Sequence, residues 1–267
     1  MPSPMTAAQL SALYDAGNQW AADDDFFLAF VNGRPNSRVL DLGCGTGRMT
    51  LAVAADGHSV VGIDPNPGSL AAARKKPGAE GVTWIDGTSA AIPQDASFDV
   101  AIMTAHVAQA INDDGDWSRT LADLHRTLVP GGRLVFDSRD PVAQAWKYWT
   151  PAETRRVHTL PDGSIVETWI ESAVETDGFV TLTEHRVLNG STEESETSVL
   201  AFRTEDQLRQ DLNSAGFTLD HLYGGWHGED VGSGNGELIV LAHKPLDSRA
   251  SSKIPQHHGV RDERERF

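Results

Sequence analysis

Residues 39–47, with the sequence VLDLGCGTG, constrain this 267-residue chain more than any other segment. An apolar run ends there in Gly43, Gly45 and Gly47, and a second apolar run, VVGID, ends at Asp64. A strand that runs through a glycine-rich loop into a helix presents bare backbone N–H groups and the positive helix end to a ligand. An acid that closes the next strand can accept the hydroxyl groups of a ribose. The pattern predicts an α/β domain that binds a nucleoside.

The glycine spacing narrows the class of ligand. The loop has the form GxGxG, whereas the dinucleotide fingerprint needs GxGxxG to wrap a pyrophosphate. No Gly-Lys-Ser or Gly-Lys-Thr follows, so the phosphate loop of nucleotide triphosphatases is missing as well. The spacing therefore disfavours a phosphate cradle. Taken alone, the motif is also compatible with an ordinary strand-to-helix turn.

Further elements follow in a regular order. An acid, Asp86, ends the apolar run VTWID, and the run FDVAIM is expected to be a buried strand. The tail of the pattern is a helix followed by two strands. The elements expected after Asp64 are a strand over 82–86, a strand over 98–103, a helix over 116–128, a strand after the turn Pro130-Gly131-Gly132, a helix over 205–215, and strands over 217–223 and 237–243.

With these pieces in this order, the sequence resembles the class I S-adenosylmethionine (SAM) methyltransferases, whose first motif carries an acid two residues before the first glycine, here Asp41. The resemblance covers roughly residues 8–145 and 200–245. It implies a doubly wound, seven-stranded, mostly parallel α/β sheet with a reversed final hairpin. It also implies SAM as cofactor and S-adenosylhomocysteine as product.

The same resemblance implies a set of cofactor contacts. Asp41 and the glycine loop would lie against the methionine part of SAM, Asp64 would bind the ribose, and Asp86 would accept from the adenine amino group. Two amphipathic helices expected within 6–33 would close over the cofactor, although aromatic residues at helical spacing are more often plain core. The full implied set is Tyr14, Trp20, Asp41, Gly43, Cys44, Gly45, Gly47, Asp64, Pro65, Asp86, Gly87, Thr104 and Ala105.

A methyltransferase of this kind needs mainly alignment of nucleophile, methyl carbon and sulfur, because SAM brings its own leaving group. A base is needed only when the nucleophile arrives protonated. His106 directly follows the strand over 98–103 and can take up a proton near neutral pH, so it is the catalytic candidate. A histidine that only packs or hydrogen-bonds near the cofactor is the alternative. Arg139, after the fifth strand, and His227, in the loop YGGWHGEDVGSGNG, are candidates for substrate binding.

Residues 151–200 interrupt the alternation of helix and strand. Pro161-Asp162-Gly163, Asp177-Gly178 and Asn189-Gly190 are turn signals between β-rich runs, which predicts an inserted antiparallel meander of about four strands. Its place in the chain puts it above the carboxyl ends of the parallel strands, where such sheets bind ligands. This arrangement resembles the sugar N,N-dimethyltransferases. A sheet that only stabilises the fold or forms a dimer stays open.

We therefore expect three parts. Residues 1–150 and 201–246 form a SAM-binding domain with an N-terminal helical lid, 151–200 form a substrate lid or dimer contact, and 247–267 form a polar C-terminal tail. The sequence leaves a homodimer open.

Composition limits the partners and the compartment. The chain has 38 acidic against 22 basic residues and a formal charge of −16, so its surface repels a phosphate backbone and nucleic acid is not expected as a partner. No secretory signal and no run of 18 apolar residues is present, which favours a cytoplasmic protein without a membrane anchor. The single cysteine, Cys44, excludes a paired-cysteine site. Three clustered acids, Asp113, Asp114 and Asp116, precede a helix and suit capping, so we predict no metal.

The combined prediction is a SAM-dependent transfer of a methyl group to nitrogen or oxygen of a small metabolite. Residues 104–107, TAHV, lack the motif of adenine and amide N-methyltransferases, and Cys44 lies far in sequence from the position of the cytosine C5 nucleophile. A catalytically inactive module that binds SAM or S-adenosylhomocysteine is the alternative. A nicotinamide-dependent oxidoreductase is disfavoured by the glycine spacing.

Overall fold

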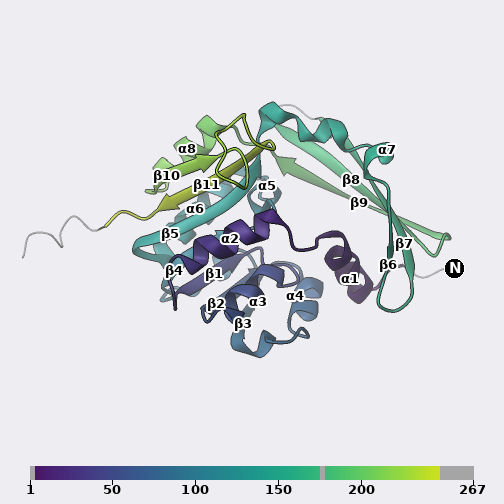
Figure 1. Cartoon of the computed structure of the whole chain (residues 1–267), viewed down its shortest axis with the longest axis horizontal. Coiled ribbons are helices and arrows are strands. Elements are labelled where there is room, and N and C mark those ends of the chain that lie inside the picture. Colours follow the sequence, from purple (N-terminus) through teal and green to yellow (C-terminus); the bar gives the residue numbers. More distant parts are fainter. Residues whose placement is uncertain (1–3, 175–177, 247–267) are drawn as a thin grey trace, which may run out of the picture.

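The computed structural model of the chain describes residues 4–174 and 178–246 and contains two β-sheets (Figure 1). The larger sheet has the strand order β10-β11-β5-β4-β1-β2-β3. Its five strands from β5 to β3 are parallel, and β11 is the reversed strand, which pairs antiparallel with β5 on one side and with β10 on the other. The strands are β1 (Arg38–Leu42), β2 (Ser59–Asp64), β3 (Val82–Asp86), β4 (Phe98–Met103), β5 (Leu128–Arg139), β10 (Thr218–Tyr223) and β11 (Glu237–His243). The predicted seven-stranded α/β sheet with a reversed final hairpin is confirmed.

Helices cover both faces of this sheet. The α-helices are α1 (Ala7–Gly17), α2 (Ala22–Asn32), α3 (Arg48–Ala55), α4 (Pro67–Ala73), α5 (Val107–Ala110), α6 (Asp114–Thr127), α7 (Pro151–Thr154) and α8 (Glu205–Ser214). Short 3-10 turns are η1 (Ala79–Gly81), η2 (Ser89–Ala91), η3 (Pro141–Ala143) and η4 (Ala145–Tyr148). The two N-terminal helices expected within 6–33 are α1 and α2.

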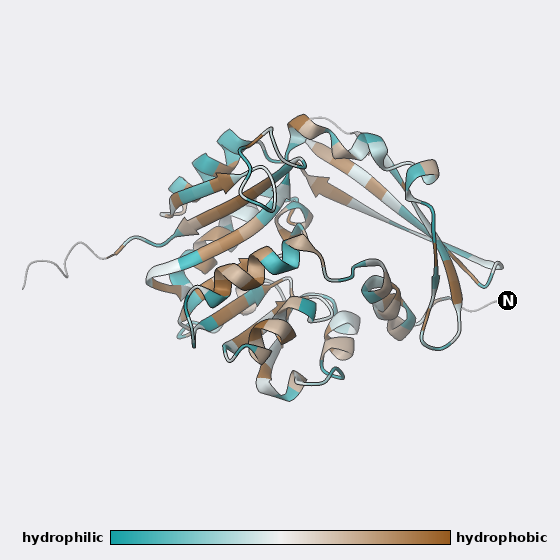
Figure 2. Cartoon of the chain, in the orientation of Figure 1, coloured by the Kyte–Doolittle hydropathy of each residue, from teal (hydrophilic) through white to brown (hydrophobic). Residues whose placement is uncertain are grey.

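The core lies in two layers on opposite faces of the larger sheet. On one face, Phe27 and Val31 of α2 and Val53 of α3 pack against buried valines of the central strands. On the other face, Trp117 and Leu121 of α6 pack with residues of α8 against the strands. Strands buried on both faces form continuous apolar runs, which is why β4 and β11 have the predicted bounds. Figure 2 shows the hydrophobic residues concentrated along these strands.

The second sheet is the predicted antiparallel meander. Its strands are β6 (Arg156–Thr159), β7 (Ile165–Val174), β8 (Phe179–Leu188) and β9 (Thr192–Ala201), in sequential order. Asn189 and Gly190 have φ of 50° and 68°, as a tight hairpin turn requires. In Figure 1 this inserted sheet extends above α1. Leu13 of α1 packs there with Leu160 and Val166, so α1 connects the two sheets. Residue 177 of the second turn signal lies outside the described residues.

Three local predictions need correction or stay outside the description. Pro130-Gly131-Gly132 does not precede β5 as a turn but interrupts its pairing: Phe98 pairs with Leu128 and Val100 with Arg133, with Gly131 at φ 76° between them. Helix α6 begins two residues earlier than predicted, because Asp113 caps it by accepting from the Asp116 amide. The tail over 247–267 lies outside the described residues. In the part of the chain that is described, no helix is both long and apolar enough to cross a bilayer.

Candidate active site

The glycine loop joins β1 to α3 at the carboxyl edge of the larger sheet. Gly43, Gly45 and Gly47 have φ of 80°, 53° and 81°, a region that side chains with a Cβ rarely adopt. A Cβ on Gly43 would lie 2.3 Å from Cγ2 of Val107, and one on Gly47 would lie 2.6 Å from the Trp84 ring. At Gly45 nothing lies within 4 Å of that position. The loop is thus packed at both ends and open in the middle, where a ligand can approach the backbone.

Asp64 fixes the open part of the loop. Its Oδ2 accepts from the Gly45 amide at 2.8 Å and its Oδ1 from the Asn66 amide at 2.8 Å. Burial raises the pKa of this carboxyl, and the two amide hydrogen bonds oppose the effect. Asp64 with Pro65 and Gly87 lines a cavity of about 410 Å³ between the glycine loop and α6.

Asp86 is exposed and pairs in register with Asp64 on the neighbouring strand. It ends β3 next to this cavity, but the residue that lines the cavity is Gly87.

Asp41 is a buried acid behind the loop. It is 1% exposed, its Oδ2 accepts from the Thr50 hydroxyl at 2.6 Å, and its Oδ1 has no partner among the described residues. Burial raises its pKa to about 7. Cys44 is buried in the loop, and burial together with Asp41 raises the pKa of its thiol, so the sulfur is an uncharged packing group.

A second, small cavity lies at the other side of the loop. About 60 Å³ in volume, it is lined among others by Tyr14, Gly43, Cys44, Thr104 and Ala105, all of them predicted cofactor residues. Burial raises the pKa of the Tyr14 hydroxyl. The structure thus brings Tyr14 of α1 to the glycine loop. Trp20 is 42% exposed and donates from its indole N–H to Asp25 at 2.7 Å, and the residues that line the cavities above do not include it.

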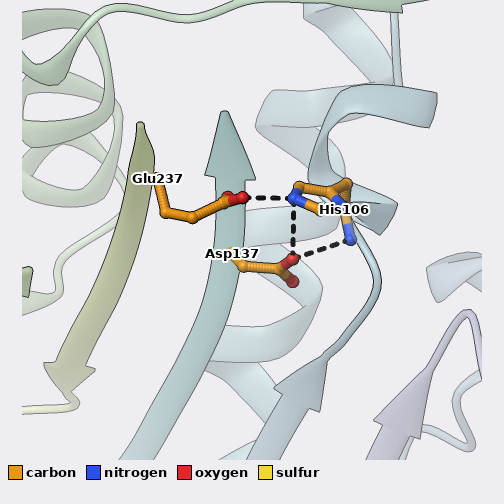
Figure 3. A group of neighbouring side chains, drawn as sticks. All are labelled: His106, Asp137 and Glu237. Atoms are coloured by element: carbon orange, nitrogen blue, oxygen red, sulfur yellow. Dashed lines mark hydrogen bonds and ion pairs between the residues drawn. The ribbon is translucent and has the colours of Figure 1, made fainter. Parts of the chain in front are cut away.

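His106 follows β4 and lies in a cluster with two carboxylates (Figure 3). Its Nε2 lies 2.9 Å from Oε2 of Glu237 and 3.3 Å from Oδ2 of Asp137. The His106 backbone N–H also donates to Asp137 Oδ2 at 3.0 Å. Burial raises the pKa of Asp137, whose Oδ1 has no partner in the described part of the chain.

Arg139 lies beside this cluster. Its guanidinium donates to Oε1 of Gln109 at 2.9 Å and lies over the Trp149 ring at 5.1 Å. Burial lowers its pKa, and the charges of Glu237 and Asp137 raise it. His227 lies apart in the loop between β10 and β11. Its side chain is 80% exposed and lies 3.5 Å from Glu229. The structure therefore brings Arg139 near the two acids that contact His106 and leaves His227 at the surface.

Sequence reasoning missed Asp137, Glu237 and Gln109. One signal was available for Asp137, because it ends the apolar run RLVF at the carboxyl edge of the sheet. Glu237 is 131 residues from His106 and reaches it only through the antiparallel pairing of β11 with β5. One ligand atom from each of His106, Asp137 and Glu237 lie within 4.8 Å of one another, a spacing that a metal ion could use. The absence of a metal stays a prediction.

Comparisons with known proteins agree on fold and domain. Residues 39–132 match the family described as "Methyltransferase domain". The demethylmenaquinone methyltransferase of Thermus thermophilus is 39% identical over 103 residues, which are 37% of this chain and 45% of that protein. The cypemycin N-terminal methyltransferase of a Streptomyces species is 25% identical over 206 residues, 77% of this chain and 82% of that protein. The chain spans about half the length of the demethylmenaquinone methyltransferases it matches, 45% and 53% of two of them.

Solved structures agree over almost the whole fold. The CcbJ methyltransferase of Streptomyces caelestis has a TM-score of 0.71 at 17% identity and covers 90% of this chain and 98% of its own. The sugar N-methyltransferase KedS8 of Streptoalloteichus has a TM-score of 0.70 at 18% identity and covers 92% and 96%. At such identities the likeness shows the fold.

The residues at the carboxyl edge of the sheet fit SAM, the cofactor that the fold family uses. Oδ1 of Asp41 is buried and has no partner within residues 4–174 and 178–246, and the backbone at Gly45 is open to a ligand. The matched domain and the fold agree with the resemblance predicted from the sequence, and the individual cofactor contacts stay a prediction. Residues 39–132 are a methyltransferase domain, and the chain has the fold of the class I SAM-dependent methyltransferases.

Proposed function

We propose that this protein transfers a methyl group from SAM to nitrogen or oxygen of a small molecule. The observation that carries the proposal is the edge formed by Gly43–Gly47, Asp41 and Asp64, where an open backbone lies between two buried carboxylates. When bound, SAM supplies a methyl group on a positively charged sulfur, and the acceptor forms its bond to that carbon as the carbon–sulfur bond breaks with its electron pair left on sulfur.

Each of two cavities would hold one part of the cofactor. Asp64, Pro65 and Gly87 would hold the nucleoside in the cavity of about 410 Å³. Asp41 and the loop, with Tyr14 above them, would hold the methionine part near the cavity of about 60 Å³. A carboxylate at Asp41 would pair with the ammonium group of SAM, which gives its buried, unpartnered oxygen a role.

A third cavity suits the acceptor. It has a volume of about 550 Å³ and lies between α1 and the inner face of the inserted sheet. Polar and charged side chains line it, including Arg156, Glu184, Arg186 and Glu196. Tyr14 borders both this cavity and the small one at the glycine loop, so an acceptor seated here can reach past α1 toward the end of β4. This lining favours a polar small molecule.

His106 would act as the base. It stands between Ala105 and Val107, which both line the small cavity, although the residues that line this cavity do not include His106 itself. An acceptor that arrives as a hydroxyl or an ammonium group must lose a proton, and an imidazole can take it. Names of two similar proteins, a sugar N-methyltransferase and an N-terminal methyltransferase, support nitrogen among the acceptors.

The test has two stages. Calorimetry should detect binding of SAM and of S-adenosylhomocysteine to the purified protein, and incubation with radiolabelled SAM and a panel of amino sugars, other amines and phenols should give labelled product. His106→Ala should then lower turnover at least tenfold with SAM affinity nearly unchanged. Binding without transfer to any acceptor would favour the inactive SAM-binding module. If neither SAM nor its demethylated product binds, while NADH does, the proposal is wrong.

A further inference from the structure

The cluster around His106 fixes which ring nitrogen is available for chemistry. We propose that Glu237 and Asp137 are positioning residues that hold the proton on Nε2 of His106 and leave Nδ1 to accept the proton of the methyl acceptor. This inference rests on the proposed function, because it assigns an atom to the base of the same site.

The geometry shows two carboxylates converging on one nitrogen. Glu237 Oε2 lies 2.9 Å from Nε2 and Asp137 Oδ2 lies 3.3 Å from it (Figure 3). An ionised carboxylate can only accept hydrogen bonds, so the nitrogen between them must donate. In a neutral imidazole only one ring nitrogen carries hydrogen, which leaves the lone pair on Nδ1. The side chain keeps 19% exposure, and the hydrogen bonds and ion pairs found for the ring among the described residues all use Nε2.

The backbone supports the same orientation. His106 has φ 63°, a left-handed conformation that is unusual for a residue with a Cβ. Asp137 Oδ2 accepts from the His106 amide at 3.0 Å, so one oxygen restrains both the backbone and the ring. Ala105, with φ 56°, shares the conformation. Strained backbone at the end of a central strand is typical of a functional site, where surrounding contacts hold it in place.

The charges around the His106 ring favour the same assignment. When Nδ1 takes up the proton, the resulting cation lies between the carboxylates of Asp137 and Glu237, which stabilise it. Arg139 is the other charged group beside the two acids, and its guanidinium is held by Gln109 and the Trp149 ring. The proton passes from the acceptor to Nδ1 and then to solvent, so the cluster ends the cycle unchanged.

A metal ion bound by the same three residues would be a different arrangement. It would occupy the Nε2 lone pair and bring a second positive group next to Arg139. The 2.9 Å separation of Nε2 from Glu237 is the length of a direct hydrogen bond. We assign the hydrogen-bonded arrangement and make the metal an outcome of the test.

The test measures which ring nitrogen of His106 carries hydrogen. Long-range ¹H–¹⁵N NMR of the full chain with ¹⁵N-labelled histidine should show the Nε2–H form of His106, its signals assigned by their loss in His106→Asn. Glu237→Gln keeps the shape of the side chain but adds an amide that can donate, so the Nδ1–H form should gain population. Its kcat should fall at least tenfold, with KM for the acceptor and SAM affinity within about twofold of wild type.

Glu171→Gln is the matched control, because Glu171 lies 3.7 Å from Nε2 of His185 on the inserted sheet. It should leave the His106 signals and kcat unchanged. A wild-type ring in the Nδ1–H form, or full kcat in Glu237→Gln, would overturn the assignment. Loss of activity on chelation with recovery on adding Mn²⁺ or Mg²⁺ would overturn it in favour of a metal site. Failure to bind SAM would instead contradict the proposed function, since the tautomer can be measured without it.

Discussion

The carboxyl edge of the larger sheet and the inner face of the inserted sheet satisfy their charged groups in opposite ways. At the edge, Asp64 is held by backbone amides, and Asp41 keeps one buried oxygen without a partner in the described structure. On the inserted sheet, Arg186 donates to Glu184 at 2.9 Å and to Glu196 at 2.7 Å. The first region leaves a buried acid for a ligand to pair with, whereas the second pairs its charged groups with one another.

The difference has a source in the chain. Contacts at the edge come from residues close in sequence around two strand ends, so a short motif encodes them. Glu184 and Arg186 share one face of β8, and Glu196 reaches them through the register in which Glu184 pairs with Glu196. A polar face encoded by register can change residue by residue without loss of the fold. This suits the part of the molecule that we propose contacts the acceptor.

The largest effect is expected for Gly43→Ala. The residue has φ 80°, and the new Cβ would lie 2.3 Å from Cγ2 of Val107, so the loop must move. We expect SAM affinity to fall at least about 100-fold, or about 3 kcal/mol, measured by calorimetry. The chain should stay folded by circular dichroism.

Val107→Ala in the Gly43→Ala background gives the control, because it removes the clashing methyl groups while the positive φ stays. Affinity should return in part. If Gly43→Ala binds SAM normally, the close packing of Gly43 against Val107 does not control SAM binding.

A second prediction concerns pH. Burial raises the pKa of Asp41 to about 7, and pairing with an ammonium group needs the ionised form. SAM affinity should therefore fall as the pH drops through 7, by about thirtyfold between pH 8 and pH 5.5, with proton release on binding. Titration calorimetry in buffers of different ionisation enthalpy measures both quantities.

The same group has an opposite effect on the ligand-free protein. A carboxyl with a raised folded pKa holds its proton in the folded state at pH values where the unfolded chain has released it, so folding stability falls as pH rises from about 4 to about 7. Asp41→Asn should flatten both the affinity and the stability profiles over this range. An affinity profile in Asp41→Asn that matches wild type would assign the pH effect to another group.

Sequence alone could predict what is local. The glycine loop, the acids that end β2 and β3, and the bounds of β3 and β4 follow from short patterns of glycine and apolar residues. The tight turn at Asn189-Gly190 follows in the same way, because both residues tolerate positive φ.

What sequence could not predict depends on long-range pairing or on single contacts. Glu237 joins His106 only because β11 runs back along β5. Trp20 fits the helical pattern of a lid, yet it lies between α1 and α2 in neither helix, and its indole N–H donates to Asp25. Histidine does not by itself favour the left-handed backbone that His106 adopts. There the His106 amide donates to Asp137, a contact that the sequence does not reveal.

A third prediction concerns the charged side chains on the inner face of the inserted sheet. Arg186→Met removes the cation that lines the acceptor cavity between Glu184 and Glu196. We expect KM for the acceptor to rise about tenfold, the worth of one hydrogen bond to a charged group, with SAM affinity unchanged. Arg155→Met is the control, since Arg155 pairs with Glu167 and lies over the Trp169 ring without lining that cavity. Equal KM values for the two variants would argue against an acceptor site there.

The smallest effect is expected for Gly163→Ala, the counterpart of Gly43→Ala in the inserted sheet. Gly163 has φ 84°, close to that of Gly43, but no atom of the described residues lies within 4 Å of its Cβ position. The substitution therefore isolates the cost of the left-handed backbone, about 1–2 kcal/mol of folding stability by chemical denaturation. SAM affinity should not change. A loss of affinity comparable to that of Gly43→Ala would mean that the effect of these substitutions on SAM binding does not arise in the glycine loop.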